Sequence, residues 1–374
     1  MIEIDGFAQA RFGAVKDAFA ANFEEGRERG ARFTLVEAGE TVVDLWAGHA
    51  DRALKVPFGK DTLTAIFSTT KALAALMIAR LVDQGRLAYD QPVAEVWPEF
   101  AQAGKEAVSV EQVLSHQAGL CGFPDEMDPA LWFDWDAICA KLAAMTPLWP
   151  PGTASGYHPS TYGFLAGEIF RRVDGRTIGT ALREDLAAPF GLDVWIGLPD
   201  AEHDRCADLM RPSGLPNFGE INAATTAAFL TPWSAPGGRG QADWRRAEFP
   251  SANGHATALA LAALMGALAD GGWLDGEMIL SPALIAEASR ERIRGQDLVL
   301  PFVMSWGAGF MRNETVKVWG PGDRTFGHSG WGGSCAFADP ETRLAGAYVM
   351  NRQSTDLIGD ARSRRLIEAA YASL

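Results

Sequence analysis

The fold of this chain is indicated most clearly by one stretch of sequence, Ala65-Ile66-Phe67-Ser68-Thr69-Thr70-Lys71-Ala72-Leu73-Ala74-Ala75-Leu76-Met77-Ile78-Ala79. After the lysine, apolar residues occupy nearly every face of the expected helix, and Gly85 is a suitable residue to end it. This pattern is typical of a central helix that is buried on all sides. We therefore expect such a helix to begin close to Ser68.

A serine and a lysine three residues apart lie on one face of the first turn of this helix. The helix N-terminus adds unpaired backbone N–H groups and a positive end near the Ser68 hydroxyl. An amine beside a hydroxyl can help to remove its proton, and an activated serine can attack an acyl carbon. Burial would depress the pKa of Lys71 and suit it to this task. Because the pattern is short, it needs partners elsewhere in the chain.

The composition narrows the class of protein. The chain has 374 residues, of which 48% are hydrophobic and 21% charged, as in a soluble globular protein with one large or two intimate lobes. A formal net charge of −14 argues against nucleic acid and against anionic membrane surfaces as partners. The basic run at Arg362, Arg364 and Arg365 is expected to be a solvated helix face.

The sequence gives no sign of a membrane segment, a disulfide framework or a cofactor. The acidic start, Met1 to Asp5, lacks the apolar region of a secretory signal, so we expect a cytoplasmic protein. The four cysteines form no C-x-x-C pair, which fits reduced thiols. The six histidines are dispersed without metal-ligand spacing, and no phosphate-binding glycine motif follows a strand. We therefore expect no metal and no other cofactor.

Strand patterns occur near both ends of the chain, with helical patterns between them. We expect an N-terminal helix with Phe7, Phe12, Val15, Phe19 and Phe23 on one face, and further elements as follows: strands at 33–36, 42–46, 306–311, 334–338 and 344–350, and helices at 256–269 and 360–373. This order predicts one lobe built from 1–85 and 251–374 around a single sheet. Residues 86–250 would form a mostly helical second lobe, with the site in the cleft between them.

Tyr157 is the first candidate partner for the serine and lysine. It lies in a turn-rich loop, Pro151 to Ser160, and the chain has five tyrosines in all. A phenol is a poor base until a nearby cation lowers its pKa, and Lys71 could supply that cation. The alternative is a loop tyrosine that is simply anchored by its hydroxyl.

The second candidate partner is the glycine-rich segment Phe326-Gly327-His328-Ser329-Gly330-Trp331-Gly332-Gly333-Ser334, which runs into an apolar strand. Glycines let a backbone approach a ligand closely, and a strand here could offer an N–H to a developing oxyanion. His328 could be a hydrogen-bond donor or a proton shuttle. The alternative is a β-bulge with a packed tryptophan.

In this order, Ser-x-x-Lys, a loop tyrosine and His-x-Gly resemble the serine β-lactamase and penicillin-binding-protein superfamily. Val113 to Leu120 is similar to its L-L-x-H-x-S-G-L segment, and Asn253-Gly254-His255-Ala256 resembles the region before its last strands. The resemblance implies an α+β fold of the β-lactamase/DD-peptidase type, with an antiparallel sheet flanked by helices and a mostly helical second lobe.

The resemblance also implies roles for individual residues. Ser68 would be the nucleophile, and Lys71 and Tyr157 would transfer protons, with the choice of general base left open. The backbone N–H groups of Ser68 and Trp331 would form the oxyanion hole, and His328 and Gly330 would lie against the substrate.

Two departures from the family pattern bear on the substrate. Tyr157 is followed by His158-Pro159, so the Asn of a class C β-lactamase is missing, and His328 replaces the lysine of K-T-G. A weakly charged histidine holds a carboxylate less firmly than a lysine does. Both changes resemble the family VIII carboxylesterases, and no G-x-S-x-G motif offers an α/β-hydrolase nucleophile instead.

The sequence therefore predicts a serine carboxylesterase that hydrolyses small, short-chain or aromatic esters through a covalent acyl-enzyme. The alternatives are a β-lactamase, a D-amino peptidase or an acyltransferase on the same fold, or a non-catalytic binding or scaffold protein. The acyl pocket has one candidate set of aromatic residues, which could equally be local core: Phe123, Trp132, Phe133, Trp135 and Trp149.

Overall fold

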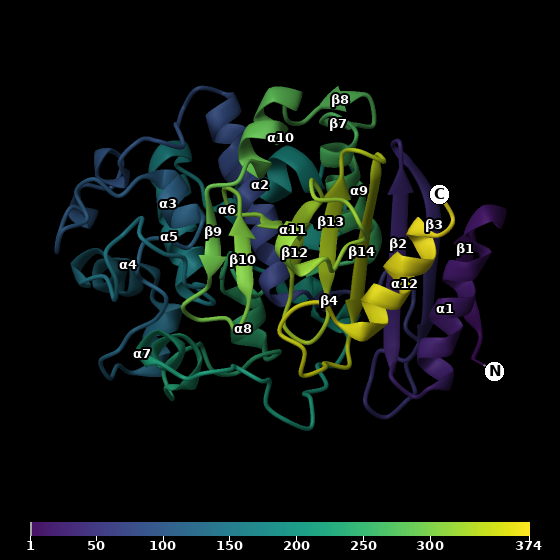
Figure 1. The fold of residues 1–374 in the computed structure, drawn as a ribbon. Helices are drawn as coiled ribbons and strands as arrows, with labels where there is room; N and C mark the ends of the chain where they lie inside the picture. Colours follow the sequence, from purple (N-terminus) through teal and green to yellow (C-terminus); the bar gives the residue numbers. More distant parts are fainter. Residues whose placement is uncertain (1) are drawn as a thin grey trace.

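The centre of the protein is a nine-stranded antiparallel sheet, in a computed structural model that describes residues 2–374 (Figure 1). Strand β2 pairs with β14, Phe33 opposite Tyr348, so the sheet joins the two ends of the chain. The lobe boundaries at residues 85 and 251 stay a prediction. In spatial order the strands are β1 (Ile4–Ala8), β3 (Glu40–Gly48), β2 (Gly30–Glu37), β14 (Leu344–Met350), β13 (Cys335–Asp339), β12 (Phe326–Ser329), β11 (Met311–Arg312), β10 (Val303–Trp306) and β9 (Ile293–Gln296).

Helices cover both faces of this sheet, which makes the fold α+β as expected. Helices α1 and α12 pack against each other on one face, and α9 lies against β2, β13 and β14 on the other (Figure 1). The helices are α1 (Gly13–Glu24), α2 (Thr70–Asp83), α3 (Val110–Leu114), α4 (Trp135–Ala144), α5 (Thr161–Asp174), α6 (Ile178–Leu182), α7 (Ala223–Thr225), α8 (Ala242–Arg246), α9 (Ala258–Ala269), α10 (Pro282–Ser289), α11 (Asn313–Val316) and α12 (Ala361–Tyr371).

Five short strands lie outside the main sheet. A three-stranded sheet has the order β4-β6-β5 and brings the approach to Ser68 beside residues of the later chain, because Ala65 pairs with His255. The other small sheet is a two-stranded antiparallel hairpin of β7 and β8. The bounds are β4 (Thr64–Ala65), β5 (Val194–Trp195), β6 (His255–Ala256), β7 (Trp273–Leu274) and β8 (Glu277–Met278).

Helix α2 is the buried central helix that the sequence predicts. Every residue from Thr70 to Ala79 is buried, and the helix packs against α5 and α10. It is preceded by a single 3-10 turn, Phe67–Thr69, on which Ser68 lies. Phe67 has a φ of 45°, a left-handed conformation that a bulky residue rarely adopts and that tertiary contacts must hold in place. The strained residue directly precedes the serine.

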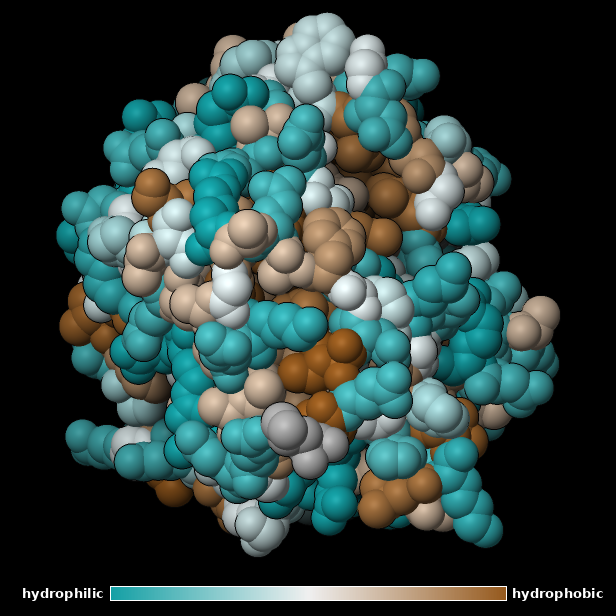
Figure 2. All heavy atoms as spheres, turned by 90° about the vertical axis from the view of Figure 1, so that its right-hand side faces the viewer, coloured by the Kyte–Doolittle hydropathy of each residue, from teal (hydrophilic) through white to brown (hydrophobic). Residues whose placement is uncertain are grey.

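The N-terminal prediction is partly wrong. Phe7 lies on strand β1, which pairs with β3, and the helix begins only at Gly13. Phe12, Val15 and Phe19 are buried as expected, whereas Phe7 is half exposed. An apolar residue in an edge strand can by chance fit the spacing of a helix face. Five apolar positions are too few to distinguish the helical period of about 3.6 residues from the strand period of two. Figure 2 shows hydrophilic residues over most of this edge of the molecule, with hydrophobic ones in separate patches.

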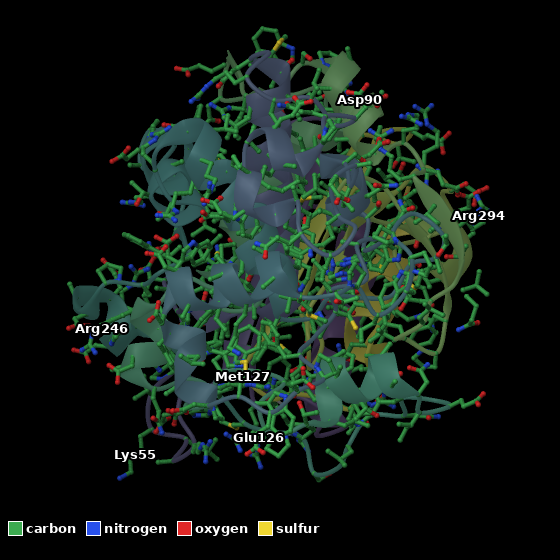
Figure 3. The ribbon with its side chains drawn as sticks, turned by 90° about the vertical axis from the view of Figure 1, so that its left-hand side faces the viewer. Lys55, Asp90, Glu126, Met127, Arg246 and Arg294 are labelled. Carbon is green, nitrogen blue, oxygen red and sulfur yellow. The ribbon has the colours of Figure 1, made fainter. Side chains whose placement is uncertain are left out.

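The opposite side of the molecule carries exposed charges. Figure 3 shows Arg246 and Arg294 at the periphery of this side. Arg246 forms an ion pair with Asp200 at 2.6 Å, and Arg294 is paired with Glu291 at 2.7 Å. No helix within residues 2–374 is both long enough and apolar enough to cross a membrane.

The expectation of a solvated basic run near the C-terminus is wrong for one of its three arginines. Arg362 is buried, and its guanidinium contacts Glu28 at 3.1 Å and Asp360 at 2.8 Å. It also donates to the Gly332 carbonyl at 2.9 Å. A buried cation needs such partners, because an unpaired charge in the interior is costly. The ion cluster therefore ties α12 to the loop that follows Trp331.

Removing Arg362 should destabilise the protein strongly. In the Arg362→Met variant, Glu28 and Asp360 lose the buried cation that compensates them, and we expect a loss of about 3–5 kcal/mol in the free energy of unfolding. Urea unfolding followed by circular dichroism measures it. Arg364→Met is the matched control, because Arg364 lies on the same helix at the surface. Equal stabilities for the two variants would show that the cluster contributes nothing.

Candidate active site

The structure brings the Lys71 amine and the Ser68 hydroxyl together at the start of α2. Lys71 Nζ lies 3.2 Å from Ser68 Oγ. The same nitrogen donates to two backbone carbonyls, that of Pro159 at 2.8 Å and that of Ser251 at 2.9 Å. Lys71 is completely buried, and burial holds the pKa of its ammonium well below the usual value. No carboxylate in residues 2–374 forms an ion pair with this amine.

These contacts fit a neutral amine. A neutral amine has two N–H donors and one lone pair, and two carbonyl oxygens accept from Nζ. The lone pair is then left for the Ser68 hydroxyl proton. An ammonium would instead donate its third N–H to Ser68 Oγ and would have no lone pair to act as a base beside the serine. Burial favours the neutral form, so the geometry prepares Lys71 to accept a proton.

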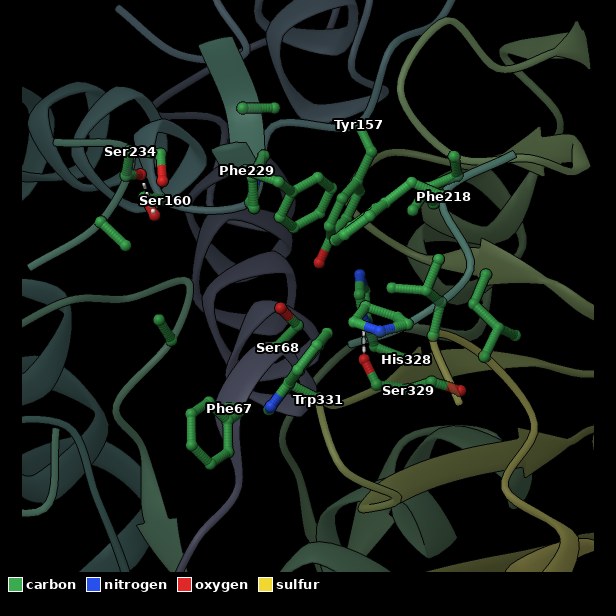
Figure 4. A pocket seen from close by; sticks show the side chains of 18 of the residues that line it. Phe67, Ser68, Tyr157, Ser160, Phe218, Phe229, Ser234, His328, Ser329 and Trp331 are labelled. Carbon is green, nitrogen blue, oxygen red and sulfur yellow. Dashed lines mark hydrogen bonds between the residues drawn. The ribbon is translucent and has the colours of Figure 1, made fainter. Parts of the chain in front are cut away.

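Tyr157 also lies close to the serine. Figure 4 shows its hydroxyl directed toward Ser68, with Phe229, Phe218 and His328 around it. The Tyr157 ring stacks on Trp306, with centroids 5.8 Å apart and an interplanar angle of 9°. Its centroid is 4.9 Å from Lys71 Nζ.

Of the two alternatives that the sequence leaves open, a Tyr157 pKa lowered by Lys71 is not favoured. Burial raises the pKa of Tyr157, the negative charge of Asp297 adds to this, and the hydrogen bond with Ser68 only partly opposes it. The expectation required a cationic Lys71, but burial favours the neutral amine. Tyr157 is therefore a protonated phenol at neutral pH, able to give a proton rather than to take one.

The carboxylate of Asp297 holds the Tyr157 loop, a role that no sequence motif indicated. Its buried carboxylate accepts from the Tyr157 N–H at 2.9 Å and from the Ser155 hydroxyl at 3.1 Å. It also accepts from the N–H groups of Val299 and Leu300, at 3.0 and 2.9 Å. Asp297 follows β9 directly, but no local pattern distinguishes it from the other acidic residues. Only the pairing of distant segments reveals its function.

Two histidines pack behind Tyr157 and are neutral. His158 Nδ1–H donates to the Gly156 carbonyl at 2.6 Å, and its Nε2 accepts from the Leu120 N–H at 3.0 Å. Burial is the main cause that lowers the pKa of His158 to about 3. The His116 ring, 4.9 Å from that of Tyr157, is uncharged for the same reason. These rings shape the tyrosine loop and add no charge to it.

His328 lies on β12 and lines the same pocket as the serine; the sequence left open whether it acts as a hydrogen-bond donor or a proton shuttle. Its Nδ1–H donates to the Ser329 carbonyl at 2.7 Å (Figure 4). Burial is the main cause that lowers the pKa of His328 to about 3, so the ring is neutral. Nε2 then carries a lone pair, and it has no hydrogen-bond partner in residues 2–374. This face of the pocket offers an acceptor and no positive charge.

Two backbone N–H groups near Ser68 are free to receive an oxyanion. Among residues 2–374, neither the Ser68 N–H nor the Trp331 N–H has a protein acceptor, and both residues line the same pocket. The Gly330 N–H is unavailable, because it donates to the Ser334 carbonyl at 2.7 Å. A Cβ at Gly330 would lie 2.3 Å from the Ile66 carbonyl oxygen, so the glycine allows β12 to approach the serine turn.

The pocket at this site has a volume of about 260 Å³ and mostly apolar walls. The walls include Phe67, Pro159, Leu215, Pro216, Phe218, Phe229, Leu230, Trp244, Trp306, Met311, Trp331, Leu357 and Ile358. The segment 215–236 supplies much of this wall, and its irregular sequence gave no signal that could have placed it there.

The aromatic residues predicted for the pocket lie elsewhere. Phe123 and Trp132 pack against each other, 5.6 Å between centroids, and Trp135 packs on Phe164 at 4.8 Å. Trp149 is buried beside His158. None of these residues, nor Phe133, lines the pocket. The alternative interpretation as local core applies to them, since large aromatic side chains gain most from burial.

A serine, a lysine and a tyrosine at one pocket beside an antiparallel sheet are the arrangement of serine hydrolases of the β-lactamase and DD-peptidase type. Residues 15–370 match the Beta-lactamase family model, and the chain belongs to this family. It is 36% identical over 372 residues to "Esterase/beta-lactamase LipL" of Mycobacterium tuberculosis, across 94% of this chain and 84% of that protein.

Two solved structures are similar along the full length of both chains. One is a penicillin-binding protein homolog from Caulobacter crescentus, with 70% identity and a TM-score of 0.98. The other is a family VIII carboxylesterase, with 44% identity and a TM-score of 0.94. Both cover 100% of this chain and 100% of the other. The chain is thus a serine hydrolase with the β-lactamase/DD-peptidase fold, as the sequence resemblance predicted.

Replacing Asp297 should misplace Tyr157. In Asp297→Ala, three backbone N–H groups lose their acceptor, and we expect kcat for an aryl ester to fall roughly 10-fold to 100-fold. Asp297→Asn is the matched control, since its side-chain oxygen can still accept from those three donors. Steady-state kinetics, with thermal unfolding in parallel, separates the two variants. A folded alanine variant with wild-type kcat would remove Asp297 from the positioning of Tyr157.

Proposed function

We propose that the protein is a serine carboxylesterase that hydrolyses small esters through a covalent acyl-enzyme. The observation that carries this proposal is the buried Lys71 amine, held by two carbonyl oxygens with its remaining position against Ser68 Oγ. A serine needs an adjacent base to become a nucleophile, and this amine is neutral and in contact with it.

In the proposed acylation, Ser68 Oγ attacks the ester carbonyl carbon and its proton moves to Lys71 Nζ. The carbonyl oxygen becomes an oxyanion and accepts from the N–H groups of Ser68 and Trp331. Such donors act on charge that develops in the transition state, and the loss of one costs about 2.7–4 kcal/mol in other serine hydrolases. The new ammonium still has the carbonyls of Pro159 and Ser251 as acceptors.

The leaving alcohol takes its proton from Tyr157. The phenol is protonated at neutral pH and faces Ser68, so it can donate as the C–O bond breaks. The proton that Lys71 took from the serine then restores the phenol. In deacylation a water molecule attacks the acyl carbon and passes a proton back through the same pair, which returns Ser68 as the free hydroxyl.

The pocket favours small, uncharged groups next to the scissile bond. Its volume of about 260 Å³ is at the low end of ligand pockets, and its walls are apolar. His328 offers a lone pair where a lactam-binding site would need a cation for the substrate carboxylate. Two relatives carry the name esterase, which supports the same choice.

β-Lactam hydrolysis is the second candidate, because one relative is named both esterase and β-lactamase. Pro159 stands where the class C enzymes have an asparagine, and this weighs against it. No contact or distance in the described residues specifically favours a D-amino peptidase, an acyltransferase or a non-catalytic scaffold. The cytoplasmic location stays a prediction.

Ser68→Ala should abolish both ester hydrolysis and covalent labelling. The variant lacks the only atom that can carry the acyl group in this mechanism, so 4-nitrophenyl acetate turnover should fall to the uncatalysed rate. Intact-protein mass spectrometry after reaction with a fluorophosphonate checks the acylation site, and a cephalosporin in the same assay tests the lactam alternative. Thr69→Ser, next to the serine, is the control and should label normally. Labelling of Ser68→Ala would identify another nucleophile.

Activity should be lost as the pH falls, because Lys71 must be unprotonated to act as base. Below its pKa the amine is an ammonium and cannot accept the serine proton, so kcat/KM has an acidic limb. His328, with a pKa of about 3, stays neutral over the range of about pH 5 to 9 and should contribute nothing to that limb. We expect His328→Gln to keep the same midpoint whatever its absolute rate. A midpoint moved by about one pH unit would show that His328 titrates.

A further inference from the structure

The active-site pocket contains a cation that the proposed mechanism does not use. Arg239 lines the pocket on its exposed rim, in a loop that follows the wall segment 215–236. Every other lining residue is uncharged, since His328 is neutral at ordinary pH. Arg239 is thus the charged residue among the otherwise uncharged described residues that line the pocket.

Arg239 has no acidic partner. The protein has 47 acidic residues and a net charge of −14, and many of its exposed arginines are paired, as Arg246 is with Asp200. In residues 2–374 Arg239 makes no ion pair and no hydrogen bond to another residue. The surrounding protein lowers its pKa, and the only charge that affects it is another cation, Arg211. No acidic residue in the described part of the chain compensates the Arg239 guanidinium.

Arg211 is also exposed and has no acidic partner in the described residues. An arginine fork is well suited to a carboxylate or a phosphate, because it can donate two parallel hydrogen bonds. An unpaired guanidinium that lines an apolar pocket fits an anion that arrives with the ligand. His328 is neutral and offers no positive charge to such an anion next to the serine. Among the described residues that line the pocket, the only cation is Arg239.

We propose that Arg239 binds an anionic group of the substrate, so that the preferred esters combine an apolar part with a terminal carboxylate or similar anion. This inference rests on the proposed esterase function and names the substrate class for the same pocket. The serine end of the site accepts the uncharged ester group, the walls hold the apolar chain, and the rim holds the charge.

The test uses two series of esters that differ only in charge. One contains 4-nitrophenyl monoesters of linear dicarboxylic acids of increasing length, and the other contains the same compounds with a terminal carboxamide in place of the carboxylate. A second pair of series, acetate esters of ω-hydroxy acids and of their amides, places the charge on the alcohol side. We expect at least one carboxylate to exceed its amide in kcat/KM by about tenfold to a hundredfold, the range for a hydrogen bond to a charged group. This preference should decline with added salt.

Arg239→Gln should remove this preference by lowering kcat/KM for the carboxylate esters far more than for the amide esters, and Arg239→Lys should retain part of it. Arg364→Gln removes the same charge from the distant α12 surface and is the matched control. If neither series shows a carboxylate preference at any length, or if Arg239→Gln lowers both kinds of ester equally, the inference is overturned. If the wild-type protein hydrolyses neither kind, the proposed esterase function has failed instead. The two failures are therefore distinguishable.

Discussion

The site depends on one constraint, the burial of a lysine amine among oxygen atoms that come from three separate parts of the chain. Lys71 is on α2, the Pro159 carbonyl is on the tyrosine loop, and the Ser251 carbonyl precedes β6. The amine can be buried only because these carbonyls accept its protons, and its burial is what makes it neutral. The same three contacts fix the tyrosine loop relative to Ser68. Folding and the preparation of the base are therefore one event.

The electrostatics around this amine are consistent with its function. His116, His158 and His328 are all neutral, and Tyr157 is protonated. The buried negative charge nearby belongs to Asp297, and it is taken up by backbone N–H groups that hold the tyrosine loop. Few full charges would thus compete with the oxyanion of the proposed acylation, and in a site of low dielectric this would increase the effect of the two free N–H groups.

A buried ion cluster holds the loop that carries Trp331, one of the two residues with a free backbone N–H. Arg362 joins Glu28 and Asp360 and donates to the Gly332 carbonyl, next to Trp331. The sequence could not predict this, because basic residues at i and i+2 of a terminal helix are usually solvated. The aromatic residues of 123–149 are a similar case. Their spacing is compatible with a pocket or with a core, and only the packing of Trp132 and Trp135 against Phe164 assigns them to the core.

The sequence by itself determined the buried helix after Ser68, the strand patterns at both ends, the order of the three motifs and the family. These features depend on the type of each residue and on the order of residues along the chain, both of which can be read directly from the sequence. Only the tertiary structure decided which oxygen atoms surround the Lys71 amine, that burial raises the pKa of Tyr157, and that His328 Nε2 is left without a partner in the described residues. It also placed Asp297 behind the tyrosine and Arg239 at the rim. The physical reason is that a protonation state depends on burial and on partners, and both come from segments far apart in the chain.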